Sequence, residues 1–503
     1  MHTHQYNCVM TSAGQNLVKE KSNNLTLLIK AYTSRAIVRT LCGDSKLAIN
    51  DLEGALSLAE KYGYEKSCAE CNLHLSKLYS SIGKYTKMYK CIKIAYNIYK
   101  KLHNKKGVAL SLSNLGNFYA YLANHKKALK YHLLALQNAA NQNNPNMLAF
   151  IFNNIGVMYF WAGDYQKARI YIMKSLRMRE KSGDKQGLAM GMTNIGATYY
   201  YQGKVKEYIS YNKQALNMQS KIGDKQGAAM SLNNIGLAYD LIGDMNSAFK
   251  YYDKSRGIFN LTGNLRYYAI GLLNTSHSYI KTGNYHNALE DCKKSLKILE
   301  SLRDTLYICE NLIICSEIYR ELNKLEKARA CLNRVEKFAN KIKSTKILIS
   351  LNLEKGELFL IESQQKDNQL APERLVEAMR WALLVEEYAK REKSKIGIGK
   401  ATLLQARIMY KNKKYQKSMK TRITIRDKFN TAIEICSSTK DRVEYASACY
   451  HYGEFLAWVS DFQSARKYLC SSKGIYSKAC NTAYLEKIAQ IEKIIKEKQA
   501  NIV

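Results

Sequence analysis

Three consecutive stretches of the chain have nearly the same sequence. They read NNIGVMYFWAGDYQKARIYIMKSLRMREKSGDKQG at 153–187, TNIGATYYYQGKVKEYISYNKQALNMQSKIGDKQG at 193–227 and NNIGLAYDLIGDMNSAFKYYDKSRGIFNLTGN at 233–264. The glycine after the Asn-Ile pair stands at Gly156, Gly196 and Gly236, a step of 40 residues. A fixed period of this length is typical of stacked supersecondary units and not of one closed globule. The sequence therefore predicts a repeat array.

A small residue followed by an aromatic ring recurs with the same period along most of the chain. The small position is occupied at Ala36, Ser76, Gly116, Gly156, Gly196, Gly236, Ser276, Ser316 and Gly356. Three residues after it stand Tyr79, Tyr119, Tyr159, Tyr199, Tyr239, Tyr279, Tyr319 and Phe359. Residues three apart share one face of a helix, so the small residue lets a second helix approach while the ring fills the space beside it.

A turn and a second helix follow in each repeat. The expected turns are Gly43-Asp44, Gly83-Lys84, Gly163-Asp164, Gly203-Lys204, Gly243-Asp244 and Gly283-Asn284. Glycine accepts the left-handed conformation that ends a helix, and Asp or Asn caps the next one. The second helix carries small residues at Ala48, Ala128, Ala168, Ala248, Ala288 and Ala328, and again seven residues later at Ala55, Ala135, Ser175, Ala215, Ser255 and Ser295. Each unit is thus predicted to be an antiparallel helix pair.

This pattern of small residue, aromatic ring, Gly-Asp turn and second-helix alanine resembles the tetratricopeptide repeat (TPR) family over roughly residues 29–480. The 40-residue period is similar to the long-repeat subclass, which includes the Pins/LGN adaptors, kinesin light chain, rapsyn and bacterial Rap-type peptide sensors. The resemblance implies an all-α, right-handed superhelix of about eleven helix-turn-helix repeats. It implies little about function, because the family is defined by architecture.

The predicted organisation has four parts. Residues 1–28 form a partial N-terminal helix or cap, and 29–348 form eight 40-residue units. Residues 349–481 form three irregular units, with an insertion at 363–372. Residues 482–503 form a C-terminal capping helix, because Leu485, Ile488, Ile491 and Ile495 recur there at helical spacing. Terminal caps of this kind close the last apolar face of a solenoid.

Composition limits the class of protein. Only Pro145 and Pro372 occur among 503 residues, which favours a chain that is helical almost throughout. No apolar run of membrane-spanning length and no N-terminal signal segment is seen, so we expect a cytoplasmic protein whose 13 cysteines are reduced thiols. The net charge of +36 is compatible with a nucleic acid, an acidic protein or an anionic membrane as partner, or with compositional bias spread over solvated helix faces.

A column of asparagines stands two residues before the small position, at Asn114, Asn154, Asn194, Asn234 and Asn274. By resemblance to the family, the first helix of each repeat lines the concave groove, and in related adaptors an Asn at this position grips the backbone of an extended peptide. Its amide group can both donate and accept hydrogen bonds. The alternative is that these amides bond neighbouring helices and contact no ligand.

Two further sets accompany the column. Asn153 and Asn233 stand one residue earlier, and Tyr121, Trp161 and Tyr201 stand five residues after the small position. We expect the three rings at the rim of the groove, where aromatic side chains supply contact area to a partner. Ordinary packing between repeats is the alternative.

A basic block runs from Lys390 to Lys428. Its candidate patch is Lys395, Lys400, Arg407, Lys411, Lys413, Lys414, Lys417, Lys420 and Arg422. Such a block could hold phosphates or an acidic partner. A charge run is more often a solvated helix face, and that interpretation stays open beside the first.

No enzyme signature is present. Cys68 and Cys71 form a lone CxxC without a second pair, and the Gly397–Lys400 stretch lacks the first glycine of a phosphate-binding loop. We therefore expect no cofactor and no catalytic or metal site. The favoured interpretation is a non-catalytic scaffold or adaptor that binds an extended or helical partner segment in its groove. The alternatives are a regulatory or sensor module of a signalling system, linked to a peptide, kinase or cyclase, and a nucleic-acid-associated protein acting through its basic surface.

Overall fold

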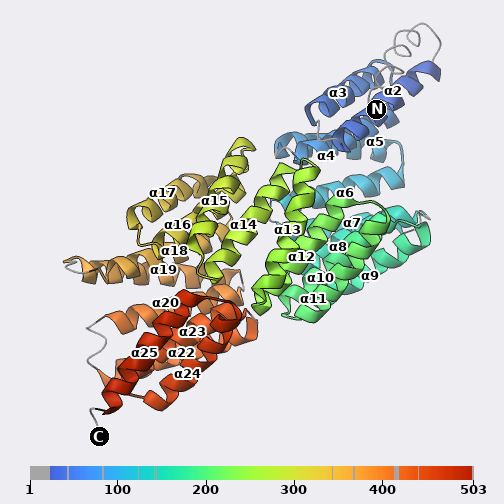
Figure 1. The fold of residues 1–503 in the computed structure, drawn as a ribbon. Helices are drawn as coiled ribbons and strands as arrows, with labels where there is room; N and C mark the ends of the chain where they lie inside the picture. The colour runs from blue at the N-terminus through green and yellow to red at the C-terminus, as the bar shows by residue number, and fades with distance from the viewer. Residues whose placement is uncertain are drawn as a thin grey trace. The chain divides into compact units, whose positions relative to one another are not determined.

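The computed structural model describes residues 23–500, apart from short gaps at 42–44, 82–83, 123, 141, 143, 343, 366–368, 393, 413–417 and 440. Most of the expected N-terminal cap and the turns at Gly43 and Gly83 lie outside the described residues. The described secondary structure consists of helices joined by short turns (Figure 1). None of these helices is long and apolar enough to span a bilayer.

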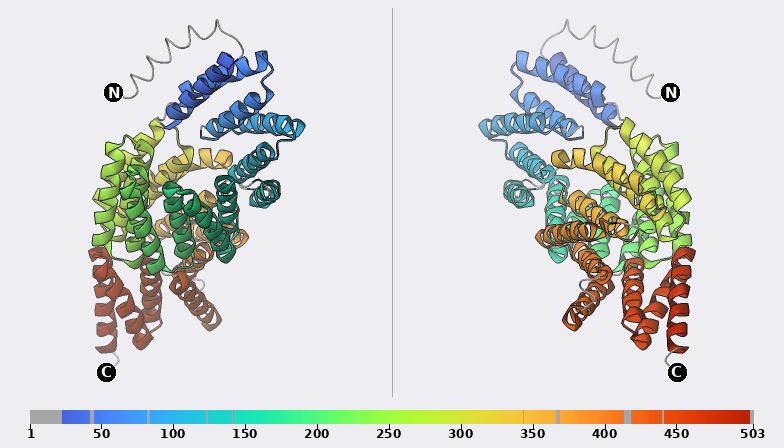
Figure 2. Two further views of the ribbon diagram at one scale, coloured as in Figure 1. Left: turned by 90° about the vertical axis from the view of Figure 1, so that its right-hand side faces the viewer. Right: turned by 90° about the vertical axis from the view of Figure 1, so that its left-hand side faces the viewer.

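The helices follow one another at a regular spacing. They are α2 (Asn23–Leu41), α3 (Ser45–Lys61), α4 (Glu65–Ser81), α5 (Tyr85–Lys101), α6 (Lys105–Tyr121), α7 (His125–Ala139), α8 (Pro145–Trp161), α9 (Tyr165–Ser182), α10 (Lys185–Tyr201), α11 (Val205–Lys221), α12 (Lys225–Ile242), α13 (Met245–Leu261), α14 (Leu265–Lys281), α15 (Tyr285–Ser301), α16 (Thr305–Glu321), α17 (Leu325–Ile342), α18 (Thr345–Glu362), α19 (Ala371–Arg391), α20 (Lys395–Lys411), α22 (Met419–Thr439), α23 (Arg442–Trp458), α24 (Phe462–Lys478) and α25 (Thr482–Ala500). Successive helices pack on one another from α2 to α9 and from α11 to α25, and Figure 2 gives two further views of these helices. The predicted all-α solenoid of helix pairs is confirmed.

The chain divides into two compact units. Unit 1 spans residues 1–198 and unit 2 spans 199–503, so the division falls within α10. Each unit has its own series of buried clusters between successive helices. This is expected of a solenoid, in which each repeat contacts its neighbours and no single core closes.

The small positions bring paired helices together, as predicted. A Cβ atom added to Gly156 of α8 would lie 2.6 Å from Cγ1 of Ile172 and 3.0 Å from the backbone oxygen of Ala168, both on α9. Where the second-helix position is serine, its hydroxyl group donates to a carbonyl of the first helix: Ser175 to Ala149 (2.7 Å), Ser255 to Ala229 (2.8 Å), Ser295 to Ala269 (2.8 Å) and Ser472 to Ala446 (2.8 Å). Small size therefore permits contact between backbones, and serine adds a hydrogen bond.

The Gly-Asp turns also form as expected where they are described. Gly163 has φ +79°, and the Asp164 carboxylate accepts from the backbone N–H of Lys167 at 3.0 Å. Repeats that lack the glycine place another residue in the same left-handed conformation: His103, Arg303, Asn323, Ser460 and Cys480. The turn geometry is thus imposed by helix packing and persists where the residue type disfavours it.

The irregular C-terminal region keeps the helix-pair pattern. The expected insertion falls between α18 and α19, that is, at the turn inside a repeat. Helix α25 occupies the residues for which a cap was predicted. Its Ile488, Ile491 and Ile495 are buried in one cluster with Leu469 and Tyr476 of α24. These isoleucines cover the apolar side of the last repeat.

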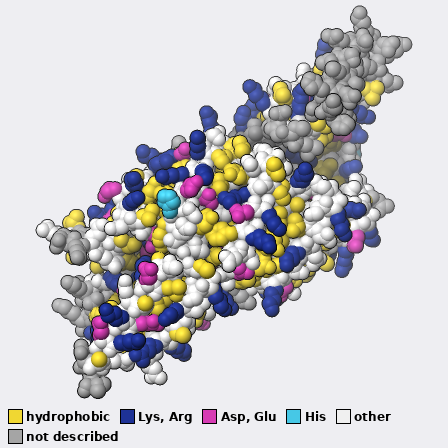
Figure 3. Space-filling model, in the orientation of Figure 1, with side chains coloured by type: hydrophobic (Ala, Val, Ile, Leu, Met, Phe, Trp, Pro, Cys, Tyr) yellow, Lys and Arg dark blue, Asp and Glu magenta, His cyan; other side chains and the backbone are white. Residues whose placement is uncertain are grey.

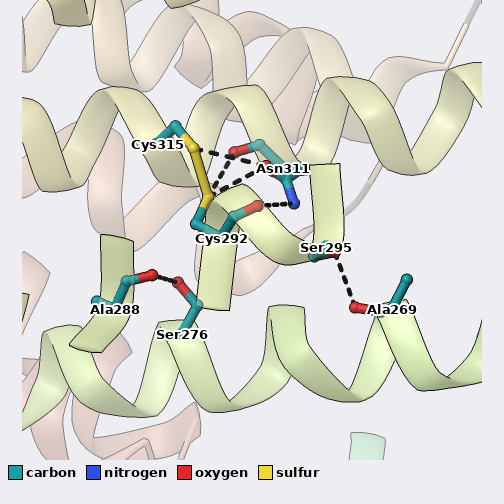
Figure 4. The surroundings of a disulfide bond; sticks show 7 residues. All are labelled: Ala269, Ser276, Ala288, Cys292, Ser295, Asn311 and Cys315. Carbon is teal, nitrogen blue, oxygen red and sulfur yellow. Dashed lines mark hydrogen bonds between the residues drawn. A yellow bond between two sulfur atoms is a disulfide. The ribbon is translucent and has the colours of Figure 1, made fainter. Parts of the chain in front are cut away.

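One expectation about the cysteines is wrong. Cys292 of α15 and Cys315 of α16 form a disulfide bond between adjacent repeats, with their Cα atoms 6.4 Å apart (Figure 4). The amide Nδ2 of Asn311 donates to the carbonyl oxygen of Cys292 at 3.1 Å beside it. Sequence reasoning missed the pair because the two cysteines are 23 residues apart, with no motif linking them. Nine further cysteines, among them Cys68 and Cys71, are free thiols in the described part of the chain.

Candidate functional site: the groove face of the first helices

We call "groove face" the side of each repeat's first helix that carries four positions, at −6, −2, +1 and +5 from the small residue. On α8 these are Phe150, Asn154, Val157 and Trp161. Their spacing of three or four residues places them on one side of the helix over about three turns. The predicted asparagine column and the predicted aromatic rim therefore belong to the same face.

In unit 1 the asparagines bond the preceding repeat. Asn154 Nδ2 donates to Ser113 Oγ at 3.4 Å, and Asn194 Nδ2 donates to Asn153 Oδ1 at 3.1 Å. Asn153 is buried and acts as the acceptor of this link, while Asn114 is 6% exposed. These contacts correspond to the packing alternative for the column.

The same contacts leave hydrogen-bonding capacity on the half-buried amides. The NH2 group of Asn154 and of Asn194 has a second hydrogen, and the Oδ1 atom of each can still accept. The inter-repeat bond also fixes the orientation of each amide. The geometry is thus compatible with a structural role and with contact to a polypeptide backbone at once.

The asparagines of unit 2 follow the same rule. Asn234 Nδ2 donates to Asn212 Oδ1 at 3.0 Å, and Asn274 Nδ2 donates to Asn233 Oδ1 at 3.0 Å. Asn212 lies on α11, the second helix of the preceding repeat, whereas the acceptors of Asn154, Asn194 and Asn274 lie on first helices. The bond from Asn274 of α14 to Asn233 of α12 repeats the link between Asn194 and Asn153.

The three predicted rim aromatics are among the most exposed rings of the molecule. Tyr121 is 53% exposed, Trp161 57% and Tyr201 56%. In unit 1, Tyr121 stacks on Tyr85 with ring centroids 5.7 Å apart, and Trp161 stacks on His125 at 6.1 Å. Tyr121 and Trp161 are therefore each packed on one side against the start of the preceding second helix, while about half of each side chain stays exposed.

The groove face of unit 2 has a different chemistry from α14 onward. Beside Asn274 and several apolar residues, its positions hold His277, Lys281, Glu317, Glu321, Glu354, Glu357, Lys400, Arg407, Lys411, His451 and Glu454. Some of these groups pair with one another, and others pair with charged side chains beside the face. Arg407 Nη1 lies 2.5 Å from Glu357 Oε1, Lys411 Nζ lies 2.8 Å from Glu454 Oε1, and Arg320 Nε lies 2.9 Å from Glu354 Oε1.

Lys281 is the most enclosed cation of this set. Its ammonium group is 2.9 Å from Asp240 Oδ2 and 3.7 Å from Asp441 Oδ2, and its side chain is 8% exposed. Asn481 Nδ2 donates to the carbonyl oxygen of Lys281 at 2.9 Å across 200 residues of sequence. Within unit 2 the C-terminal repeats therefore lie against α12 and α14, on the side that carries the groove face.

Burial and charge shift the pKa values of this region. Burial alone would lower the pKa of Lys281, but Asp240 and Asp441 keep it above its ordinary value. Burial, helped by Arg407, lowers the pKa of His451 to about 4. The pKa of Glu454 falls to about 2 because hydrogen bonds and charges from His451 and Lys411 outweigh its burial. At neutral pH the region thus holds ion pairs around a neutral imidazole.

Three cations of the basic block have acidic partners among the described residues. Lys400 pairs with Glu444 at 2.6 Å, and Arg407 and Lys411 make the ion pairs described above. The guanidinium group of Arg422 lies 5.1 Å from the Trp458 ring centroid, while Lys395 and Lys420 are exposed. Lys413, Lys414 and Lys417 lie outside the described residues. Figure 3 shows Lys and Arg side chains spread over the whole visible face.

A pocket on unit 2 was not expected from the sequence. It has a volume of about 560 Å³ and is lined mainly by Leu375, Met379, Leu383 and Leu384 of α19 and by Ile408 of α20. Exposed apolar residues seven apart on α19, Val376 and Leu383, were the signal that could have indicated it. No group of three or more His, Cys, Asp or Glu side chains able to hold a metal occurs among residues that the structure describes.

Comparison with known proteins agrees with the helix-pair architecture. Family models of the tetratricopeptide repeat match residues 147–221, 188–260 and 270–298. No curated protein matches the sequence. A Rap protein complexed with competence and sporulation factor is similar at 13% identity, over 79% of this chain and 99% of that chain, with a TM-score of 0.47.

Two other solved structures are similar at the same level. A signal transduction ATPase with a tetratricopeptide repeat sensor, from Pyrococcus horikoshii, shares 18% identity over 67% of this chain and 53% of that chain, with a TM-score of 0.48. Aspartyl phosphate phosphatase F from Bacillus subtilis shares 15% over 66% and 88%, with a TM-score of 0.46. The matched residues carry tetratricopeptide repeats, and the helix pairs on either side of them continue the same pattern.

Proposed function

We propose that the protein is a non-catalytic adaptor that binds a polypeptide segment of its partner along the groove face of α6, α8 and α10 in unit 1. The carrying observation is that large aromatic rings stay exposed on this face, Tyr121 and Trp161, in line with half-buried amides at Asn154 and Asn194. Exposed aromatic side chains are enriched where proteins bind partners, because they supply large contact area at a small entropy cost.

The two kinds of side chain have different tasks in this proposal. Asn154 and Asn194 present a carbonyl oxygen and a second amide hydrogen to the partner's backbone, in an orientation held by the inter-repeat bonds. Trp161 and Tyr121 lie two helical turns beyond the asparagine position of their helices. There they contact apolar side chains of the partner. Backbone contacts supply affinity and the rings supply selectivity.

The face also carries no charge of its own. Between the amide and the ring stand Asn117 on α6 and Val157 on α8, and Ala197 takes the same place on α10. A segment bound here meets amides, apolar groups and rings, so its affinity at this face depends weakly on salt. The charged groove face of unit 2 would not share this property.

The test compares Tyr121→Ala/Trp161→Ala with the matched control Ile170→Ala/Met173→Ala. All four side chains are exposed, and the control pair lies on the second helix α9. Each full-length protein is used to capture partners from lysate, with nuclease present, at low and moderate salt, and captured proteins are identified by mass spectrometry.

We expect wild type and control to retain the same proteins and the Tyr121/Trp161 variant to lose them. Circular dichroism establishes that all three proteins are equally helical. Identical capture by the Tyr121/Trp161 variant and the control would contradict the proposal, as would binding that nuclease abolishes.

A further inference from the structure

Unit 1 contains a long stretch without any acidic residue. Between Glu70 and Asp164 the sequence has no Asp or Glu, yet it has twelve lysines: Lys77, Lys84, Lys87, Lys90, Lys93, Lys100, Lys101, Lys105, Lys106, Lys126, Lys127 and Lys130. All twelve side chains are exposed. Among residues that the structure describes, the salt bridge from Lys101 to Glu65 at 2.5 Å is the one ion pair that any of them makes. The positive charge of these repeats is therefore not neutralised by the chain itself.

Part of this charge is arranged with the repeat period. Lys87, Lys127 and Lys167 stand 40 residues apart, in the first turn of α5, α7 and α9. Each ammonium group lies over the tyrosine ring that follows the small residue of its own repeat: Tyr79 at 5.4 Å, Tyr119 at 5.4 Å and Tyr159 at 5.5 Å from the centroid. The next repeat has Glu207 at this position, so the row ends there.

Two neighbours extend the row. Lys84 directly precedes α5, and Lys126 lies in the first turn of α7. We call these five residues, Lys84, Lys87, Lys126, Lys127 and Lys167, the lysine edge. The first turn of a helix is already positive because its N–H groups are unpaired, and cations are disfavoured there. The lysine edge thus adds positive charge at helix ends where the helix dipole disfavours it, with the tyrosine rings as a modest compensation.

We propose that the lysine edge of unit 1 binds an acidic polypeptide segment, whose carboxylates pair with one or two ammonium groups in each successive repeat. Charge complementarity supports this occupant. Lys167 pairs with Asp164 at 3.1 Å, but among the described residues the other four lysines of the edge make no ion pair, and such a row of cations matches an extended chain bearing carboxylates. The surface lies on the second helices and is distinct from the groove face of the first helices.

The chemistry of the edge favours carboxylates over nucleic acid. No arginine occurs between Arg39 and Arg169. Phosphate groups are bound best by arginine, whose planar guanidinium group can donate two hydrogen bonds to one phosphate, so a lysine-only surface is a poorer match for nucleic acid. Single-stranded nucleic acid also needs open ring faces on which bases stack. Here Tyr119 stacks on Tyr131 at 5.2 Å and Tyr159 on Tyr171 at 5.4 Å, and the lysines lie over the same rings.

The test measures binding of fluorescent polyglutamate to the full-length protein by anisotropy. The variant is Lys84→Gln/Lys87→Gln/Lys126→Gln/Lys127→Gln. Its matched control is Lys294→Gln/Lys390→Gln/Lys473→Gln/Lys493→Gln, which removes the same charge from lysines of unit 2 that pair with Glu290, Glu386, Glu492 and Glu497. All eight side chains are exposed, so both proteins should fold.

We expect the lysine-edge variant to bind polyglutamate about tenfold more weakly than wild type, equivalent to about 1.4 kcal/mol, and the control to bind as wild type does. Wild-type affinity should fall as salt rises. Equal weakening of both variants would show that net charge alone attracts the probe and would overturn the proposal.

Two further arms exclude other occupants. Oligothymidylate and phosphatidylserine vesicles are measured against the same proteins, and tighter binding of either than of polyglutamate would overturn the proposal. The Tyr121→Ala/Trp161→Ala variant should keep its affinity for polyglutamate, because the rings carry no positive charge. If that variant lost its affinity for polyglutamate, the probe would be bound at the groove face, and the lysine-edge proposal would be overturned. If the lysine-edge variant bound polyglutamate as tightly as wild type, the lysine-edge proposal would be wrong while the proposed groove adaptor would be unaffected.

Discussion

The groove faces of the two units are built on the same periodic positions and differ in chemistry. On α6, α8 and α10 the positions hold amides, apolar side chains and exposed rings such as Trp161. On α14 to α23 they hold charged groups that pair across repeats, such as Arg407 with Glu357. One helical scaffold thus supports a face open to a partner and a face whose charges are satisfied by the chain itself.

Removing one side chain from either face leaves its former partner without a hydrogen bond or a counter-ion. A neutral amide that loses its bond can turn to water when the site is half-buried. A buried charge that loses its counter-ion cannot do so without cost. The difference between the two faces should therefore be measurable as stability, in addition to any difference in binding.

The largest effect is expected at Lys281. The substitution Lys281→Met leaves the buried Asp240 without its cation and removes the pairing with Asp441. We expect a loss of roughly 3–5 kcal/mol in the free energy of unfolding, measured by urea denaturation. Lys294→Met, which removes an exposed pair with Glu290, is the control and should leave the free energy of unfolding almost unchanged. Equal effects would show that the charged face contributes no more than ordinary surface pairs.

A smaller effect is expected in unit 1. Asn194→Ala removes the donor to Asn153 Oδ1 and leaves that buried oxygen unpaired. We expect a loss of about 1–2 kcal/mol in urea denaturation. The double variant Asn153→Ala/Asn194→Ala should cost little more than Asn194→Ala alone, since both partners are then absent. Additive losses would contradict the inter-repeat bond.

The charged face should respond to acid through His451. Its pKa in the folded protein is about 4, below the ordinary value of 6.5, so the folded state keeps the imidazole neutral while the unfolded state takes up a proton. The resulting stability is present above pH 6.5 and is lost as pH falls toward 4. Between pH 7 and 5.5 the loss should be about 1 kcal/mol. His451→Gln should lose less stability than wild type over this range in urea titrations. Parallel pH profiles would exclude His451 as the source.

The smallest effect should be the same in both units. Gly54 of α3 and Gly257 of α13 are interior to second helices, and an added Cβ atom would meet nothing within 4 Å. Gly54→Ala and Gly257→Ala should each raise stability by about 0.5–1 kcal/mol, because alanine loses less backbone entropy than glycine in a helix. Thermal unfolding checks this, with Gly156→Ala as a control that should destabilise by clashing with Ile172. Unequal gains in stability for Gly54→Ala and Gly257→Ala would indicate that the second helices of the two units also differ.

Much of the candidate site could be predicted from the sequence. The period placed Asn154 and Trp161 on one helix face, and Trp161 is 57% exposed there. Its place at the rim of a binding groove stays a prediction. The partner of each amide could not be predicted, because Asn194 bonds Asn153 in the preceding repeat and Asn234 bonds Asn212 on a second helix. Periodicity defines which side a residue occupies and leaves open which atom it meets.

The basic block shows the limit of counting charges along the chain. Lys400, Arg407 and Lys411 are consecutive cations on one helix, but their counter-ions are Glu444, Glu357 and Glu454 from α23 and α18. At these three positions a run of cations in the sequence is therefore neutralised in the folded chain. The stretch from Lys77 to Lys130 differs from the basic block, because it contains no acidic residue and its lysines are exposed. Among the described residues, most of these lysines have no acidic partner.

By itself, the sequence determined the repeat, the helix pairs and the turns of this protein. These features depend on contacts within a repeat, where a small residue, a ring and a glycine act over a few turns of chain. Only the tertiary structure decided which side chains of the groove face stay exposed and which of its charges form ion pairs. That outcome depends on how successive repeats stack, which brings Lys281 beside Asp441 and Asn481 across some 160 to 200 residues, a separation over which no local pattern operates.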